Sequence, residues 1–89
     1  MIQISDLSRW AIDTWGEEAQ VNMAVEECAE LICAIAQDSR GRDNIDVAGE
    51  IADVIIMMEQ LRLIYDGVDE ALALKRNRLE EKLYEEAES

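Results

Sequence analysis

Two long segments of this sequence are apolar on most sides of a helix and contain acidic residues but no basic ones. Residues 21–36 have three glutamates as their only charged residues, and residues 47–58 have one glutamate and one aspartate. These five acids are Glu26, Glu27, Glu30, Glu50 and Asp53. An ordinary surface helix carries mixed charge on its wet face and one apolar stripe. Both segments are therefore predicted to be helices that pack against protein on more than one side.

The whole chain is predicted to be one all-α domain. Apolar spacing and the turn residues between the periodic segments predict four helices and no strand. Their expected ranges are 6–15, 18–37, 44–65 and 68–85. Because proline is absent and the loops are short, residues 1–89 are predicted to fold as an antiparallel helical bundle. The acidic tail, residues 85–89, is expected to fray.

Local signals predict the helix ends. Ser5 is expected to cap the first helix and Gly16 to end it. Asp43 or Asn44 is expected to cap the third helix. The turn Asp66-Gly67 separates the third helix from the fourth, in which Leu72, Leu79 and Leu83 share one stripe.

The core of so short a chain is expected to need a further source of stability. A chain of 89 residues buries roughly 60% of its unfolded surface, which makes a single core marginal. Trp10 and Trp15 are predicted to fill the core, since the sequence contains no phenylalanine. The two long apolar helices offer more apolar surface than one hairpin can cover, so a homo-oligomer is expected to complete the bundle.

Composition excludes several classes of function. The chain has no histidine and two cysteines, which excludes Ser-His-Asp and Cys-His catalysis, four-cysteine zinc sites and a disulfide framework. A formal charge of −13 with 8 basic residues argues against nucleic-acid binding. No apolar run is long enough to span a membrane. Reduced thiols and the lack of an export signal predict a cytoplasmic protein.

The acids are spaced so that pairs of carboxylates share one helix face. Glu27 and Glu30 are three residues apart, as are Glu50 and Asp53. No Lys or Arg lies within four positions of the glutamates at 26, 27 and 30, so the usual ion pairs are missing. If the two helices pack antiparallel, the carboxylates can converge and then need a cation. Ligation by oxygen alone favours Mg²⁺, with Mn²⁺ as a substitute, or Ca²⁺ over zinc or copper.

The acidic segments resemble a known family. Glu26-Glu27-Cys28-Ala29-Glu30-Leu31, followed by Glu50-Ile51-Ala52-Asp53, is similar to the Glu-Glu-x-x-Glu … Glu-x-x-Asp signature of MazG-like all-α nucleoside triphosphate pyrophosphohydrolases. The segment Lys75-Arg76-Asn77-Arg78-Leu79 resembles the basic segment on the last helix of these proteins. The Tyr-Pro that often follows that segment is absent here. The resemblance extends over roughly residues 5–83.

The resemblance implies Mg²⁺-dependent hydrolysis of a (d)NTP to the (d)NMP and pyrophosphate by a homodimer or a dimer of dimers. It implies these metal ligands: Glu27, Glu30, Glu50 and Asp53. Lys75 and Arg78 would bind phosphate, and Asn77 and Trp15 are weaker candidates for contact with the base or ribose. The proton of the attacking water needs a carboxylate acceptor. Glu26 is one candidate, and a ligand such as Glu27 acting in two roles is the other.

Other interpretations remain open from sequence alone. The acids are also explained by the solvated helix faces of an acidic protein, and Lys75 and Arg78 by ordinary surface pairing. A second class of function is an acidic helical binding module that mimics nucleic acid or masks a basic partner. A third is a catalytically silent nucleotide sensor. The binding module requires acids spread over the surface, as in residues 80–88, whereas the hydrolase requires acids gathered between apolar helices.

Overall fold

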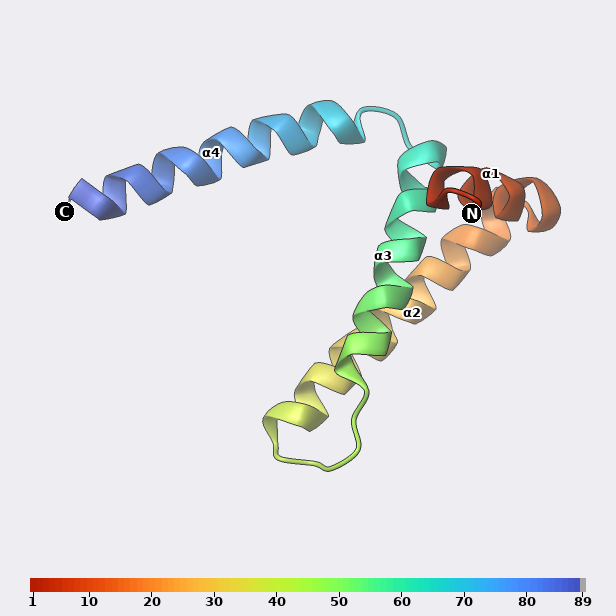
Figure 1. Cartoon of the computed structure of the whole chain (residues 1–89), viewed down its shortest axis with the longest axis horizontal. Helices are drawn as coiled ribbons and strands as arrows, with labels where there is room; N and C mark the ends of the chain where they lie inside the picture. The colour runs from red at the N-terminus through yellow and green to blue at the C-terminus, as the bar shows by residue number, and fades with distance from the viewer. Residues whose placement is uncertain (89) are drawn as a thin grey trace.

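The structure is a computed structural model that describes residues 1–88, and in this range it contains four α-helices and no strand (Figure 1). The helices are α1 (Ile4–Trp15), α2 (Glu17–Ser39), α3 (Val47–Ile64) and α4 (Val68–Glu88). The all-α prediction is therefore confirmed. α4 continues past its predicted end to Glu88, and the final residue of the predicted frayed tail, Ser89, lies outside the described residues. None of the helices described is both long and apolar enough to cross a membrane.

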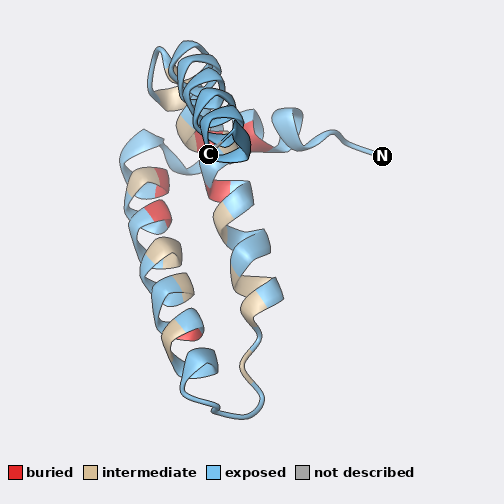
Figure 2. Cartoon of the chain, turned by 90° about the vertical axis from the view of Figure 1, so that its left-hand side faces the viewer, coloured by how far each residue is buried: buried red, intermediate tan, exposed pale blue. Residues whose placement is uncertain are grey.

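The central unit is an antiparallel hairpin of α2 and α3, with α1 lying across the end where the hairpin is open (Figure 1). Among residues 1–88, the buried apolar residues are Ala24 and Ala34 on α2 and Met57 on α3. The buried positions of the hairpin lie on the sides where its two helices face each other (Figure 2). Alanine at two of these positions keeps the bulk between the helices small. We call the interface between these facing sides of α2 and α3 the seam of the hairpin, and the candidate metal centre lies in it.

α4 does not join the bundle that the sequence predicts. It extends away from the hairpin (Figure 1), and none of its described residues is buried. An exposed ion pair between Arg62 of α3 and Asp69 of α4 spans the turn. Such pairs contribute little to stability. A bundle that includes α4 is therefore not formed within one chain, and the stripe of Leu72, Leu79 and Leu83 is exposed. Completion of the antiparallel bundle by a second copy stays a prediction.

The chain exposes far more surface than a compact protein of its mass. Its accessible area is 7227 Å², whereas a folded monomer of 10.1 kDa exposes about 5,300 Å². Its radius of gyration is 16.6 Å, against about 12 Å for a compact domain of this length. Trp10 and Trp15 are 62% and 66% exposed, so the prediction that they fill the core is wrong for the single chain.

Two predicted caps are also wrong. α1 begins at Ile4 because the carbonyl oxygen of Gln3 already accepts from the backbone N–H groups of Asp6 and Leu7, which places Ser5 inside the helix. α3 is capped by Asp46, whose Oδ1 accepts from the Gly49 N–H at 2.9 Å, and not by Asp43 or Asn44. Gly16 ends α1 as predicted.

Gly49 makes room for this cap. A Cβ at position 49 would lie 2.2 Å from Oδ2 of Asp46, so any larger residue would push the capping carboxylate away. Glycine is favoured at position 49 because the capping carboxylate of Asp46 occupies the space that a side chain would need. The capped first turn of α3 also sets the direction of Glu50, one residue further on.

Candidate metal centre

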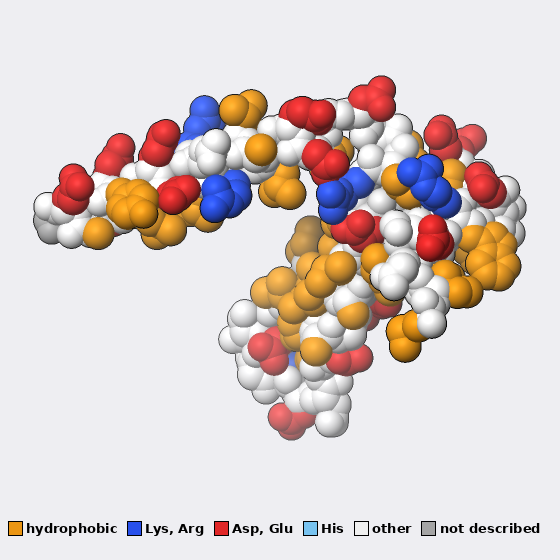
Figure 3. Space-filling model, turned by 45° about the horizontal axis from the view of Figure 1, so that its top comes forward, with side chains coloured by type: hydrophobic (Ala, Val, Ile, Leu, Met, Phe, Trp, Pro, Cys, Tyr) orange, Lys and Arg blue, Asp and Glu red, His pale blue; other side chains and the backbone are white. Residues whose placement is uncertain are grey.

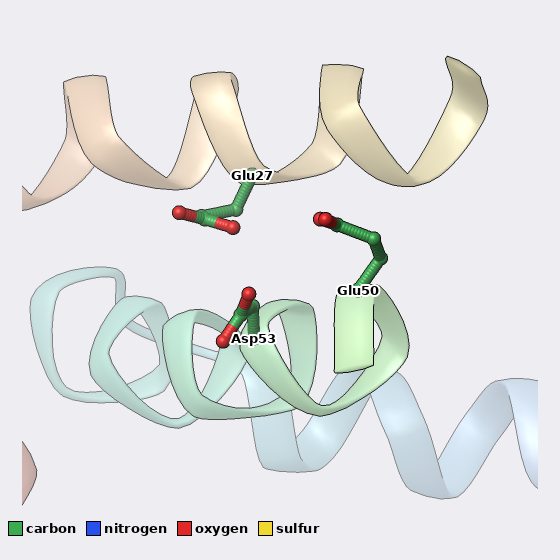
Figure 4. A group of neighbouring side chains, drawn as sticks. All are labelled: Glu27, Glu50 and Asp53. Atoms are coloured by element: carbon green, nitrogen blue, oxygen red, sulfur yellow. The ribbon is translucent and has the colours of Figure 1, made fainter. Parts of the chain in front are cut away.

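Three carboxylates from two helices meet in the seam of the hairpin (Figure 4). Glu27 extends from α2 toward α3, and Glu50 and Asp53 extend from α3 toward α2. One oxygen of each residue lies within 4.8 Å of the oxygens of the other two. We call these residues the acid trio. Glu27 and Glu50 are half-buried, whereas Asp53 is exposed.

The trio follows from helix geometry together with antiparallel packing. Glu50 and Asp53 are three residues apart on α3, so they lie on neighbouring turns of one face. Glu27 lies three residues after the buried Ala24, on the face of α2 that packs on α3. The sequence predicts each helix face, and the hairpin brings the two faces together.

The seam disfavours ionisation of Glu27 and Glu50. Burial raises the pKa of Glu27 above its ordinary value of 4.5, and the charges of Glu30, Asp53 and Glu50 raise it further. Burial likewise raises the pKa of Glu50, with further contributions from Glu30, Asp53 and Asp46. Every neighbouring charge named here is a carboxylate. The cluster therefore lacks the positive partner that would keep it ionised.

Two oxygens of the trio also lack hydrogen-bond donors. Oε2 of Glu27 and Oε2 of Glu50 are buried and have no partner among the described residues. α2 contains no Lys or Arg, and the single arginine of α3, Arg62, pairs with Glu59 and Asp69. Buried carboxylate oxygens normally accept hydrogen bonds or bind cations. Closely spaced oxygen ligands suit a hard divalent cation such as Mg²⁺, Mn²⁺ or Ca²⁺.

Glu30 lies beside the trio and not within it. It is exposed, and it borders with Glu50 a hollow of about 400 Å³ at the loop end of the hairpin. Asp46 and Asn44 also line this hollow, so it combines acidic and polar groups with an apolar wall. Glu30 is therefore connected with Glu50 through this hollow, and its charge also contributes to the raised pKa of Glu27. Glu26 is exposed and has no place in the group.

The other predicted site residues lie elsewhere. Lys75, Asn77 and Arg78 are exposed on α4, which extends away from the hairpin (Figure 1). Asn77 accepts a hydrogen bond of 3.3 Å from Arg76. Trp15 is exposed at the end of α1 and lines an apolar hollow against α3. Within one chain, the predicted phosphate-binding residues are not brought to the acids.

Two residues near the site were missed from the sequence. Asp46 caps α3 and borders the acidic hollow, and its position directly before the first apolar residue of the helix was a usable signal. Gln60 is 5% exposed, two turns beyond Asp53 on α3. No sequence signal marks Gln60, because burial of a glutamine depends on which helix covers it.

Comparison with protein-family models, with curated proteins and with solved structures finds no match to this chain.

Proposed function

We propose that this protein is a Mg²⁺-dependent nucleoside triphosphate pyrophosphohydrolase of the MazG-like type, which converts a (d)NTP to the (d)NMP and pyrophosphate. The observation that supports it most is the acid trio, with one donor-free buried oxygen on Glu27 and another on Glu50. A solvated acidic face would leave its oxygens in water. The acid trio supports the choice of cation. The two acidic motifs, in the order of the MazG-like signature, support the choice of reaction.

Glu27, Glu50 and Asp53 would hold the cation. A bound Mg²⁺ would neutralise triphosphate oxygens and position a water for in-line attack on phosphorus. Attack breaks one bond of the α–β phosphoanhydride, and a carboxylate must accept the proton of the water. Glu30 is better placed than Glu26 for this role, because it borders the hollow that Glu50 also lines.

We also propose that the active form is a homo-oligomer. The chain exposes about 1,900 Å² more than a compact monomer of its mass would, so two copies that bury this excess would bury about 3,800 Å² together, within the range of obligate homodimer interfaces. Figure 3 shows hydrophobic side chains along the edge of α4 that faces the hairpin, and on the hairpin itself. Leu79 and Leu83 of α4 are 58% and 61% exposed. These surfaces suit burial against a second copy.

An apolar groove on the hairpin is the natural place for that contact. It has a volume of about 500 Å³ and is lined by residues of α2 together with Leu61 and Tyr65. Val25 and Ile32 in its wall are 65% and 69% exposed. The leucine stripe of α4 from a second copy would cover it. Such packing would also carry Lys75 and Arg78 to a neighbouring hairpin, where their charges would offset those of the triphosphate.

The test is a product assay. Purified protein is incubated with Mg²⁺ and each common (d)NTP, and pyrophosphate, orthophosphate and monophosphate are measured. Pyrophosphate and monophosphate in equal amounts are expected, and Glu50→Gln should lower kcat at least about 100-fold, since loss of outer-shell support alone costs 10–100-fold at metal sites. Glu81→Gln, an exposed acid on α4, is the matched control.

The outcomes separate the candidate functions. Release of orthophosphate alone, or of no product from any nucleotide, refutes the hydrolase. Nucleotide binding without turnover would then support the silent sensor, and the lack of both would support the acidic binding module. The acidic residues of α4, which lie mostly along one edge of that helix in Figure 3, suit a basic partner in that last case.

A further inference from the structure

The loop that joins α2 to α3 (Figure 1) begins with a complete Schellman motif. Gly41 has a φ of 78°, the left-handed conformation that this kind of helix end requires. Its N–H donates to the Asp38 carbonyl at 3.0 Å, and the N–H of Arg42 donates to the Gln37 carbonyl at 3.1 Å. The backbone of Arg40-Gly41-Arg42 is therefore held by hydrogen bonds to the last turns of α2.

An arginine is unusual at the last position of this motif. The residue after the left-handed glycine often makes an apolar contact with the end of the helix. Arg42 occupies this position and is exposed, and Gln37, which accepts its hydrogen bond, is also polar and exposed. Apolar packing therefore does not explain the side chain at position 42.

The motif places two arginines at the edge of the hollow beside the acid trio. Gln37, whose carbonyl accepts from the N–H groups of Arg40 and Arg42, lines this hollow. Asn44, two residues past Arg42, lines it as well. The hollow has a volume of about 400 Å³ and is bordered by Glu50 of the trio. It therefore connects the candidate cation ligands with the start of the loop.

The two loop arginines are available to bind an anion. Neither Arg40 nor Arg42 forms an ion pair or a side-chain hydrogen bond with another residue among residues 1–88. The remaining basic residue of the hairpin, Arg62, is already paired with two acids. Because the hollow itself is bordered by acids, an anion is expected to enter it only together with a cation.

We propose that Arg40 and Arg42, the loop pair, bind the two phosphates of the triphosphate that leave as pyrophosphate. This rests on the proposed function. A cation at the trio would bind the phosphates from one end of the hollow, and the loop pair would donate to their oxygens from the other. Gln37 follows Glu30 by seven residues, about 10 Å along one face of α2. A chain of phosphates and an arginine side chain together can bridge such a distance.

The rival explanation is that the loop pair only stabilises the end of α2. A positive charge near a helix C-terminus interacts favourably with the helix dipole, and the last turn of α2 contains no basic residue. This explanation predicts that Arg40→Gln and Arg42→Gln melt at a lower temperature and bind phosphate as the wild type does. The proposal predicts that both variants lose phosphate affinity, whatever their melting temperature.

The test uses inorganic pyrophosphate with excess Mg²⁺, and calorimetry measures its binding to the full chain. The wild type should bind saturably, and Arg40→Gln and Arg42→Gln should each bind at least about tenfold more weakly, the loss expected for one charged hydrogen bond. Arg9→Gln is the matched control, because it removes the same charge from an exposed position on α1. The loop pair is refuted if the wild type does not bind, if either loop variant binds as tightly as the wild type, or if Arg9→Gln weakens binding equally.

A second pair of variants tests the position of the arginines and not their charge. Asparagine tolerates the left-handed conformation at position 41, whereas a β-branched residue does not. Gly41→Asn should therefore keep the affinity for pyrophosphate, and Gly41→Val should weaken it although both arginines remain. Wild-type affinity in Gly41→Val would refute the positioning by the Schellman motif.

These results are separate from catalysis. Pyrophosphate binding that depends on both arginines, in a protein that turns over no nucleotide, would refute the hydrolase and keep the phosphate site. Turnover of a nucleotide together with unchanged pyrophosphate affinity in Arg40→Gln and Arg42→Gln would keep the hydrolase and refute the loop pair.

Discussion

Glu27 on α2 and Glu50 on α3 face each other across the hairpin, and each has one buried carboxylate oxygen without a hydrogen-bond donor. They are 23 positions apart in the sequence and come within 4.8 Å of one another through their ligand oxygens. Burial and mutual repulsion raise the pKa of both. A seam built in this way is less stable when its acids ionise, unless a cation joins them.

The first prediction concerns pH. The pKa values of Glu27 and Glu50 lie above 4.5 in the folded state. Between pH 4.5 and these folded pKa values, the folded state therefore binds more protons than the unfolded state. The contribution of these groups to the free energy of unfolding is therefore full below pH 4.5 and falls as the pH rises through the folded pKa values. Thermal melts in EDTA at pH 5 and pH 8 check this. A higher melting temperature at pH 8 would contradict it.

The second prediction concerns the cation. Mg²⁺ requires ionised ligands, so it should raise the melting temperature more at pH 8 than at pH 5. At 100 times its Kd, the expected rise for a domain of this size is about 10 °C or more. Na⁺ at equal ionic strength controls for screening of the −13 charge. An equal rise with both salts would show that no specific site exists.

The third prediction separates the fold from the site. Glu27→Gln and Glu50→Gln each remove a charge from the seam, so each should melt higher than the wild type in EDTA at pH 8. Both should also lose the rise caused by Mg²⁺. The matched control, Glu81→Gln on α4, should keep that rise. A variant of the trio that melts lower in EDTA and still responds to Mg²⁺ would place the cation elsewhere.

The fourth prediction distinguishes two neighbouring glutamates. Glu30 borders the hollow beside Glu50, whereas Glu26 is exposed away from the trio. Glu30→Gln should lower kcat about 100-fold, in line with loss of a general base, while Glu26→Gln should turn over close to the wild-type rate. Steady-state kinetics with saturating Mg²⁺ checks this. The reverse order would assign the proton acceptor to Glu26.

The fifth prediction concerns assembly. Leu79 lies on the leucine stripe of α4, and Leu74, which is 72% exposed, lies on another side of the same helix. Leu79→Glu should convert the oligomer to a monomer, and Leu74→Glu should leave it intact. Light scattering after size exclusion at micromolar concentration gives the masses. A monomeric wild type would refute the oligomer.

The positions of the helices depend on local sequence, whereas their packing depends on the whole fold. The helix positions were predictable because apolar spacing and the turns at Gly16 and Asp66-Gly67 are local signals. The cap of α3 was misplaced, although Asp46 directly precedes the apolar run, because the polar loop offers several capping residues. The packing of α4 could not be predicted, because an amphipathic stripe does not reveal whether its partner belongs to the same chain.

By itself, the sequence determined four helices, two of them apolar with unpaired acids, since spacing, turn residues and missing basic residues are properties of the chain alone. Which acids meet depends on how the helices pack. Antiparallel packing of α2 and α3 brings Glu27 to Glu50 and Asp53 and leaves Glu26 outside, and the fold buries Gln60. The physical reason is that a helix face is set by local periodicity, whereas burial depends on what the rest of the fold lays against that face.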